Sequence, residues 1–499
     1  MAVDLVAVTE GLQALPLPQL IAVATGVVFL AALVMRILGN KFQGNAPPVD
    51  EGIPFVGGLI KFSKGPLDLM TEMYAKHGEV FTIPLLHKNM TFLIGPNVSP
   101  YFFNSTDEKM SQTEVYNFNV PTFGKGVVYD VDVKIRAEQF RIVGDALKSA
   151  KLKSYVPMFI QEAEEYFAKW GETGTVNLLD VFGELIIMTA SRTLLGREVR
   201  EHMFREVADL YHDLDDGMRP LSVIFPYAPT AYHRKRDAAL KQLQGIFGKV
   251  LAARRASSTK EDDMLQVLMD ANYQKVNNGR KLTDEEITGL LIAILFAGQH
   301  TSTVTSSWTG YRMMSTKDTT FAAAVKEQQE MMKKHGEKLD FDILTSMDVL
   351  HWNIHEALRL GPPLIMVMRY SKEAFSVTTS KGKTHIIPKN HIVACSPTFA
   401  HLLPQVFEHP DKYEPDRFLP PREEQNAKPF SYLGFGGGRH ACMGQMFAML
   451  QIKTIWSVLM RNFDFEMIDA FPEPDYTSMV IGPKPCRVKY TRRKLQPAV

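Results

Sequence analysis

The sequence predicts a mainly helical protein with small β-sheets, preceded by a single apolar segment long enough to cross a membrane. Three observations lead to this prediction. Apolar residues recur at helical spacing through residues 137–314, as at Leu178, Phe182 and Leu185. Strand-like segments are short and few. Close to the N-terminus, residues 11–35 contain no charged side chain.

The composition is that of a large folded protein and excludes several classes. Of the 499 residues, 45% are hydrophobic and 22% are charged, close to the averages of globular proteins. The 56 Lys and Arg residues balance 55 Asp and Glu residues to a net charge of +1, so no basic excess indicates nucleic acid as a partner. Three scattered cysteines, Cys395, Cys442 and Cys486, exclude a disulfide framework and a cysteine cage for zinc or an iron–sulfur cluster.

The N-terminal segment predicts a membrane anchor. Residues 17–38 are mostly apolar and approach the ~20 residues that a membrane-spanning helix needs. A signal peptide, one alternative, would carry positive charge before the apolar run, whereas Asp4 precedes it and Arg36 lies at its end. A buried core helix is the other alternative. The positive-inside rule places the N-terminus in the lumen, so we expect residues 1–45 to be an anchor and linker and residues 46–499 to be one cytosolic domain.

The chain after the anchor is expected to fold as one body. At ~150 residues per domain its length would suggest about three domains, but no Gly/Ser linker divides it after Asp50. Short apolar segments predict strands at residues 80–85, 91–94, 375–379 and 384–387. Breaks rich in proline or glycine are interpreted as loops at residues 220–229, 361–363 and 415–438.

The strongest chemical signal is the segment from Phe435 to Gly444 (FGGGRHACMG), which leads into an apolar helical stretch. Its consecutive glycines permit positive φ and let the backbone approach a flat, bulky group. A thiol just before a helix N-terminus has its thiolate stabilised by the helix dipole and by free N–H groups. Cys442 is therefore a candidate nucleophile or single axial metal ligand. The alternative is a buried cysteine in a glycine-rich turn.

Glu356 and Arg359 lie three residues apart, on one face of a predicted helix. The E-x-x-R pattern is common, and on its own it describes an ordinary solvated ion pair. Arg417, in the segment Pro415-Asp-Arg-Phe418, lies between this pair and Cys442 in the sequence.

Residues 283–315 predict a long helix with an unusual centre. Thr283 and Glu286 form a capping box, and apolar residues follow at helical spacing. The segment from Ala297 to Ser302 (AGQHTS) then places Gly, Ser and Thr in the middle of the helix, where they weaken helix propensity and can bond back to carbonyl groups. We expect a local opening or bulge there, with a functional role. A polar patch at a helix crossing is the alternative.

Residues 116–130 form an aromatic segment that includes Tyr116, Phe118, Phe123 and Tyr129. Core packing is the default interpretation of such a segment.

Taken together, these motifs resemble a known family. The string F-x-x-G-x-H-x-C-x-G around Cys442 resembles the haem-ligating loop of the cytochrome P-450 monooxygenases. Most members of that family have an acid immediately before the Thr that matches Thr301, whereas this sequence has His300, as sterol 14α-demethylases do. The resemblance runs from about Pro47 to the C-terminus and implies the cytochrome P-450 fold.

The resemblance also implies the cofactor and its ligands. Haem b would bind through the thiolate of Cys442 as axial iron ligand. The haem propionates would be held by Tyr116, Tyr129, Arg136, Arg369 and His440. A buried network that supports the haem-side core would consist of Glu356, Arg359 and Arg417.

Substrate and proton-delivery residues follow from the same resemblance. The walls of the sterol site would be Tyr116, Phe118, Phe123, Phe296, Ala297, Leu364, Met366, Met479 and Val480. Thr301 would guide protons to oxygen, and His300, whose ordinary pKa is near neutral, would relay them. We expect Asp237 to pair with His300 in this relay. A purely structural salt bridge is the alternative.

The implied reaction is three successive oxidations of the sterol 14α-methyl group, which release formate and leave a 14,15 double bond. O2 and electrons from NADPH would be needed. Because the chain has no flavin or nicotinamide fingerprint, a separate NADPH–cytochrome P-450 reductase would supply the electrons. The implied location is the endoplasmic reticulum membrane, and azole inhibitors are implied ligands of the haem iron.

Phe118 bears on the choice of sterol. Relatives that accept 4,4-dimethyl sterols carry a smaller aliphatic residue there, so the ring is expected to favour 4α-monomethyl sterols such as obtusifoliol.

Three other functions are alternatives to sterol demethylation. They are a cytochrome P-450 with another substrate, a thiolate-haem isomerase that uses no O2, and an anchored helical scaffold without haem.

Overall fold

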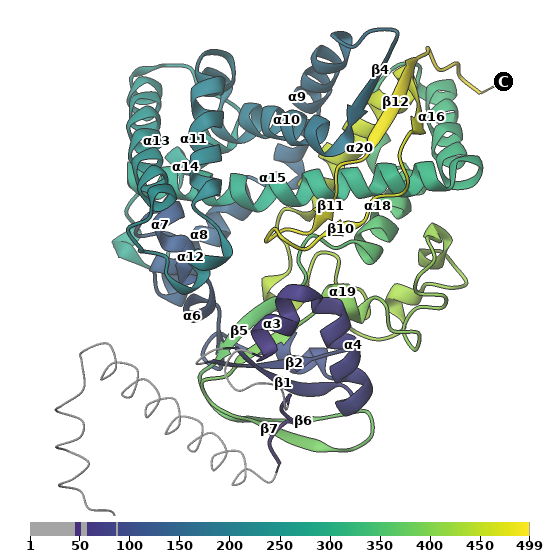
Figure 1. Ribbon diagram of the computed structural model, residues 1–499. Coiled ribbons are helices and arrows are strands. Elements are labelled where there is room, and N and C mark those ends of the chain that lie inside the picture. The colour runs from purple at the N-terminus through teal and green to yellow at the C-terminus, as the bar shows by residue number, and fades with distance from the viewer. Residues whose placement is uncertain (1–44, 51–56, 86–87, 499) are drawn as a thin grey trace, which may run out of the picture.

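The computed structural model describes residues 45–50, 57–85 and 88–498. The predicted membrane segment, residues 17–38, lies outside the described residues. The described chain is mainly helical, with small sheets, as predicted (Figure 1).

Helix α15 (Asp284–Ser315) runs across the middle of the molecule (Figure 1). The side chain of Thr283 accepts a hydrogen bond from the N–H of Glu286, and the carboxylate of Glu286 accepts one from the N–H of Thr283, which confirms the predicted capping box. By length and composition α15 would suffice to cross a membrane, but most of its apolar window is buried inside the protein. It is the central core helix.

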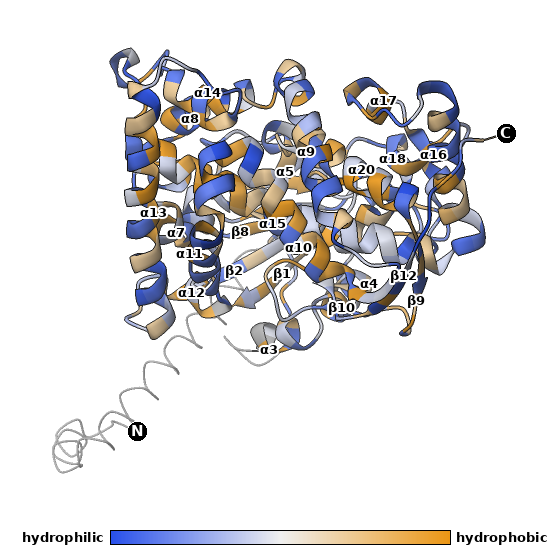
Figure 2. Cartoon of the chain, turned by 90° about the horizontal axis from the view of Figure 1, so that it is seen from above, coloured by the Kyte–Doolittle hydropathy of each residue, from blue (hydrophilic) through white to orange (hydrophobic). Residues whose placement is uncertain are grey.

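The core forms where apolar faces of long helices meet α15. Helix α10 (Leu178–Ala190) packs along α15, and α9 (Ser149–Ala168) packs on α20 (Gln445–Asn462). Trp456 of α20 is fully buried, and its indole N–H donates to the carbonyl of Ser306 at 3.2 Å, so that α20 is joined to α15. Figure 2 shows hydrophobic residues gathered on α10 and α15 in the middle of the molecule.

Two further helices lie beside one end of α15. Helices α11 (Phe204–Asp216) and α13 (Ala231–Ala256) pack against each other, and α13 also contacts α15. The other α-helices are α3 (Gly57–Lys64), α4 (Pro66–His77), α5 (Ser99–Phe103), α6 (Thr113–Tyr116), α7 (Val120–Phe123), α8 (Val133–Asp145), α12 (Pro220–Ile224), α14 (Met264–Asp270), α16 (Ala322–His335), α17 (Phe341–Thr345), α18 (Asp348–Leu360) and α19 (Pro397–Ala400).

Short single-turn segments interrupt or follow these helices. They are η1 (Asn117–Asn119), η2 (Val128–Asp130), η3 (Ser191–Leu195), η4 (Val199–Met203), η5 (Asn277–Gly279), η6 (Lys317–Phe321), η7 (Pro415–Phe418), η8 (Glu424–Asn426) and η9 (Gly438–His440).

The sheets lie at the edges of the helical body. The five-stranded sheet has the order β1-β2-β8-β5-β3, and only β2 and β8 run parallel among its described neighbours, with Met90 opposite Ile392. A three-stranded sheet, β4-β12-β9, and the pairs β6-β7 and β10-β11 complete the set. The strands are β1 (Val80–Leu85), β2 (Lys88–Leu93), β3 (Met110–Ser111), β4 (Thr173–Asn177), β5 (Val367–Ser371), β6 (Phe375–Thr378), β7 (Thr384–Ile387), β8 (Ile392–Cys395), β9 (Phe463–Met467), β10 (Pro474–Asp475), β11 (Gly482–Pro483) and β12 (Arg487–Arg492).

The predicted strands are confirmed within a few residues of their bounds, since β1, β2, β6 and β7 cover them. One predicted loop is only partly a loop, because residues 220–229 contain helix α12. The buried hydroxyl of Ser222 donates to the carbonyl of Gly217 at 2.7 Å and lies 2.9 Å from Nε2 of His233, which fastens this short helix to α13.

Candidate functional site

Cys442 lies at the end of a tight loop that precedes α20. Its N–H donates to the carbonyl of Phe435 at 2.9 Å, which closes the loop. Gly438 has φ +63°, and a Cβ there would lie 2.1 Å from the carbonyl oxygen of Phe103. Glycine is therefore required at this position both by its positive φ, as predicted, and by the close approach of the Phe103 backbone.

The Cys442 thiol keeps exposed surface. Enough protein nevertheless surrounds the sulfur for burial to raise the pKa of the thiol, while the N–H groups of Gly444 and Gln445 lower it. The predicted stabilisation by free N–H groups at the start of α20 is present. Because burial outweighs it, a bound cation would be needed to keep this sulfur as a thiolate at neutral pH.

Exposed residues occur in the middle of α15 and around the start of α20, although both helices are largely buried. Ala297 is exposed in the middle of α15, although Leu295 and Ser302 on either side are buried. Around the start of α20, Met443 and Met446 are 44% and 46% exposed. A small exposed residue on α15 and an exposed cysteine before α20 are features that a flat prosthetic group bound against these two helices would need.

Asp107 brings together three of the predicted propionate ligands. Its Oδ1 accepts a hydrogen bond from Arg136 at 2.9 Å and lies 3.1 Å from Nε2 of His440. Arg369 is buried and donates to the carbonyl of Phe102 at 2.6 Å. Burial alone would raise the pKa of Asp107, but hydrogen bonding and charge from His440, with the charges of Arg136 and Arg369, lower it. Arg136 and His440 therefore already hold a carboxylate, and the charge of Arg369 adds to the positive field around it.

The two predicted tyrosines complete this cluster. The rings of Tyr116 and Tyr129 stack with centroids 5.4 Å apart, and the Tyr116 hydroxyl accepts a hydrogen bond from the N–H of Met368 at 3.1 Å. Burial raises the pKa of both phenols, so both remain neutral hydrogen-bond donors.

The site fits a haem. A guanidinium and an imidazole already hold the carboxylate of Asp107, and two neutral phenols lie nearby, which are the donor types that two propionates require. Cys442 before α20 and the small residue Ala297 on α15 are both exposed. Cys442 would hold the iron, and the carboxylate-binding residues would hold the propionates: Tyr116, Tyr129, Arg136, Arg369 and His440.

Thr301 lies within an unbroken helix. Its hydroxyl donates to the carbonyl of Ala297 at 2.7 Å, as expected for a mid-helix threonine. The predicted opening or bulge is wrong, because α15 continues through this point to Ser315.

His300 pairs with Asp215 and not with Asp237. Nε2 of His300 lies 3.1 Å from Oδ1 of Asp215, at the C-terminal end of α11. The predicted partner, Asp237, accepts from its own neighbour Arg236 at 2.7 Å, and its side chain is 60% exposed. The predicted partner is wrong, because the carboxylate that meets His300 belongs to Asp215 of α11 and not to a residue at the start of α13. The hydrogen bond to Asp215 raises the pKa of His300 above its ordinary value.

The aromatic residues predicted to line the substrate site lie close together, and they are called the aromatic wall below. Phe118 and Phe123 are buried, and the Phe123 ring lies 6.0 Å from Phe296 and 6.4 Å from Tyr129. The Phe118 ring lies 6.4 Å from that of Tyr116. The aromatic segment therefore joins α15 to the carboxylate-binding cluster.

The second predicted wall consists of two segments that the backbone joins. The N–H of Ile481 donates to the carbonyl of Pro363 at 2.8 Å, which brings Met479 and Val480 close to Leu364. Leu364 and Met479 are 43% and 39% exposed. Met366 packs instead against the apolar cluster under the five-stranded sheet.

Glu356, Arg359 and Arg417 form the predicted buried network. Arg359 donates to both oxygens of Glu356 at 2.7 and 2.8 Å, and Arg417 donates to one of them at 3.0 Å. All three side chains have no exposed surface. Arg359 also donates to the carbonyls of His401 and Lys412, so this network ties α18 to the loops before Cys442.

The structure adds two residues that the sequence did not indicate. Asp107 lies in a short polar loop with no motif around it. Asp215 is one of several acids near the end of α11, Asp213, Asp215 and Asp216 among them. Helical spacing could have shown that only some of them face the protein, but not which one meets His300.

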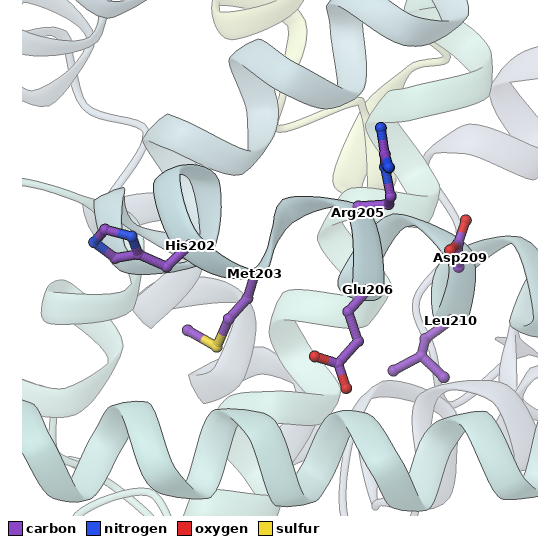
Figure 3. A pocket seen from close by; sticks show the side chains of 6 residues that line it. All are labelled: His202, Met203, Arg205, Glu206, Asp209 and Leu210. Atoms are coloured by element: carbon purple, nitrogen blue, oxygen red, sulfur yellow. The ribbon is translucent and has the colours of Figure 1, made fainter.

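The surface also has a pocket of about 490 Å³ (Figure 3). It is lined by the end of η4 and the start of α11: His202, Met203, Arg205, Glu206, Asp209 and Leu210. None of the predicted site residues lines it.

The comparisons agree with the geometry. A family model described as Cytochrome P450 matches residues 47–490. The chain belongs to this family and is a haem monooxygenase. The structure superimposes on a retinoic acid-bound cyanobacterial member with a TM-score of 0.76 over 90% of this chain and 99% of that one; at 23% identity this shows the fold alone.

Within the family, the chain belongs to the sterol 14-demethylases. An obtusifoliol 14-alpha demethylase of Sorghum bicolor is 54% identical over 95% of this chain and 96% of its own length. A sterol 14-demethylase of Arabidopsis thaliana is 53% identical, over 94% and 98%. A lanosterol 14-alpha demethylase of Mus musculus is 39% identical, over 90% and 88%.

Proposed function

We propose that this protein removes the 14α-methyl group of obtusifoliol or a closely related 4α-monomethyl sterol. The observation that carries the proposal is the higher identity to the plant obtusifoliol enzymes than to the mammalian lanosterol enzyme. The methyl group would be oxidised to the alcohol and then to the aldehyde, and a third oxidation would release it as formate and leave a 14,15 double bond.

Bound haem would supply the oxidation of an unactivated C–H bond by O2, with two electrons entering in each cycle. We propose that NADPH–cytochrome P-450 reductase delivers them. Cys442 would hold the iron, the aromatic wall would orient the sterol and exclude water, and His300 and Thr301 would move protons inward. Azole inhibitors would bind at the iron.

The proposal is tested with holoenzyme, reductase and NADPH. We expect a red-shifted Soret band after reduction with CO, a spin shift on addition of obtusifoliol, and one formate per sterol. A normal CO spectrum without sterol-dependent formate would contradict the proposed reaction and favour a cytochrome P-450 with another substrate. A CO spectrum without the red shift would contradict thiolate ligation.

Phe118 is expected to set the preference between sterols. Its ring is buried in the aromatic wall, where it would crowd a second methyl group at C4. One methyl group is worth ~1–3 kcal/mol of discrimination, so Phe118→Leu should reduce the obtusifoliol-to-lanosterol ratio of kcat/KM by ~10-fold or more. Competition between the two sterols measures the ratio.

Phe159→Leu is the matched control for this experiment. Phe159 is a buried core residue that packs against Phe447, outside the aromatic wall. This variant should lose stability and keep the ratio. Equal ratios in wild type and Phe118→Leu would show that the ring does not select the sterol.

We propose that His300, held by Asp215, relays protons to Thr301. The folded-state pKa of His300 is raised. His300 therefore stays protonated to higher pH in the folded protein. Its contribution to stability is fully present below the unfolded-state pKa and is lost as the pH rises through the folded-state pKa. Asp215→Asn lowers the pKa of His300, so the alkaline fall of product formation should move to lower pH, and NADPH oxidation should exceed product formation.

Asp237→Asn is the matched comparison, since Asp237 bonds Arg236 and not His300. Asp237→Asn should leave the pH dependence of product formation the same as in the wild type. The relay would be excluded if Asp215→Asn and His300→Ala both kept wild-type coupling and pH dependence with intact haem.

We propose that residues 17–38 anchor the protein in the endoplasmic reticulum membrane, with residues 46–499 as one domain in the cytosol. A group of exposed apolar side chains on and after α12 supports a membrane-facing surface, because soluble surfaces rarely gather such residues: Leu221, Val223, Ile224, Phe225 and Tyr227.

A further inference from the structure

A strained turn lies directly before Tyr129. Val128 has φ +50°, in the left-handed region that β-branched residues rarely adopt. Strain of this kind persists only where the surroundings impose it, and it is found at functional sites. The turn belongs to the segment that carries Phe123 and Tyr129, so its conformation sets where both rings lie.

Gln139 of α8 holds this turn from both sides. Its side chain is fully buried. Its amide oxygen accepts from the N–H of Val128 at 2.9 Å, and its amide nitrogen donates to the carbonyl of Gly126 at 2.8 Å. One amide therefore satisfies a donor and an acceptor of the turn, which a side chain without both functions could not do.

The amide is itself held in place from the far side. Its nitrogen also lies 3.2 Å from the hydroxyl of Tyr273, which donates to Glu286 at 3.0 Å. Glu286 is the capping-box residue at the start of α15, and it binds Arg280 through both oxygens. The turn is therefore connected by hydrogen bonds to the N-terminus of α15.

Gly289 of α15 allows the segment that carries Phe123 and Val127 to pack closely against this helix. A Cβ on Gly289 would lie 2.6 Å from the carbonyl oxygen of Phe123 and 2.9 Å from a methyl group of Val127. The backbone before Val128 therefore packs against α15, and Gln139 binds the same stretch through the carbonyl of Gly126 and the N–H of Val128. The segment has little freedom to move.

Gln139 also shares a helix face with a predicted propionate ligand. Arg136 lies three residues earlier on α8, and both side chains are buried. We propose that Gln139 is a positioning residue, which holds the strained Val128 turn so that the phenol of Tyr129 reaches a haem propionate beside Arg136. This inference rests on the haem site proposed above, and it assigns Gln139 a role beyond core packing.

The experiment compares Gln139→Ala, Tyr129→Phe and the double variant as holoenzymes. The propionate bending band of the resonance Raman spectrum reports hydrogen bonds to the propionates. We expect both single variants to shift this band in the same direction, and the double variant to shift it no further than Tyr129→Phe does. Additive shifts, or an unshifted band in Gln139→Ala beside a shifted one in Tyr129→Phe, would overturn the inference.

A rescue variant keeps the test decisive if Gln139→Ala binds haem poorly. Glycine adopts positive φ without strain, so Val128→Gly in the Gln139→Ala background should restore haem binding and return the band toward its wild-type position. Failure of this rescue would contradict the role of Gln139 in holding the turn.

Gln328→Ala is the matched control. Gln328 is a buried glutamine of α16 that bonds Met347 and Arg461. It should lower stability without moving the band; a band shifted as far as in Gln139→Ala would show a general packing effect and overturn the inference. An unshifted band in Tyr129→Phe itself would remove Tyr129 from the proposed haem site, which is a distinct failure.

Discussion

Replacing Cys442 by serine is expected to abolish product formation. In haem-thiolate enzymes the sulfur donates electron density to the iron and favours O–O cleavage, and a serine hydroxyl does not replace it. Because burial raises the pKa of the Cys442 thiol, a bound iron would be needed to keep the sulfur deprotonated. The reduced CO complex of Cys442→Ser should lack the red-shifted Soret band, and formate release should fall to background.

Cys486→Ser provides the control, because Cys486 is buried and its thiol contacts only the carbonyl of Ala470 among the described hydrogen bonds. That variant should keep the red-shifted band. A red-shifted band in Cys442→Ser would mean that another residue holds the iron.

Glu356→Gln is expected to cause the largest loss of stability. The substitution leaves Arg359 and Arg417 as buried charges without their shared carboxylate. Breaking one partner of a buried ion network costs about 3–5 kcal/mol. The free energy of unfolding, and with it the yield of holoenzyme, should fall accordingly; denaturant titration followed by far-UV circular dichroism measures the change.

Glu473→Gln is the exposed counterpart, since Glu473 pairs with Lys484 on the surface. This pair is solvated, so its removal should leave the unfolding transition where the wild type has it. If both variants unfolded at the same denaturant concentration, the network would not support the core.

Local patterns predicted the elements whose causes are local. The capping box at Thr283 depends on two side chains three residues apart, and the strands at residues 80–85 and 384–387 depend on short apolar runs between breakers. The buried network at Glu356 was predictable only through the resemblance, because E-x-x-R alone does not distinguish a buried pair from a solvated one.

Long-range pairings were the part that the sequence could not supply. Asp215 and Asp237 are both acids on neighbouring helices, and only the packing of α11 against α13 and α15 decides which of them meets His300. The role of Asp107 could be recognised only in the fold, where its carboxylate lies between His440 and Arg136. The continuous course of α15 shows that tertiary packing outweighs the weak helix propensity of Gly298 and Thr301.

The bond from Thr301 to Ala297 limits what this hydroxyl can offer. A hydroxyl has one hydrogen, and here the helix backbone receives it, so neighbouring groups meet the lone pairs of Thr301. Handing a proton onward requires rotation about the Cβ–Oγ bond, which breaks an interaction worth about 0.5–1.5 kcal/mol net. That is about one to two and a half times the thermal energy of about 0.6 kcal/mol. The cost is this small because the rotation leaves the backbone hydrogen bonds of the helix intact. The hydroxyl of Thr301 can therefore pass on its single proton only by rotating away from the main chain of α15, which holds it in its present orientation.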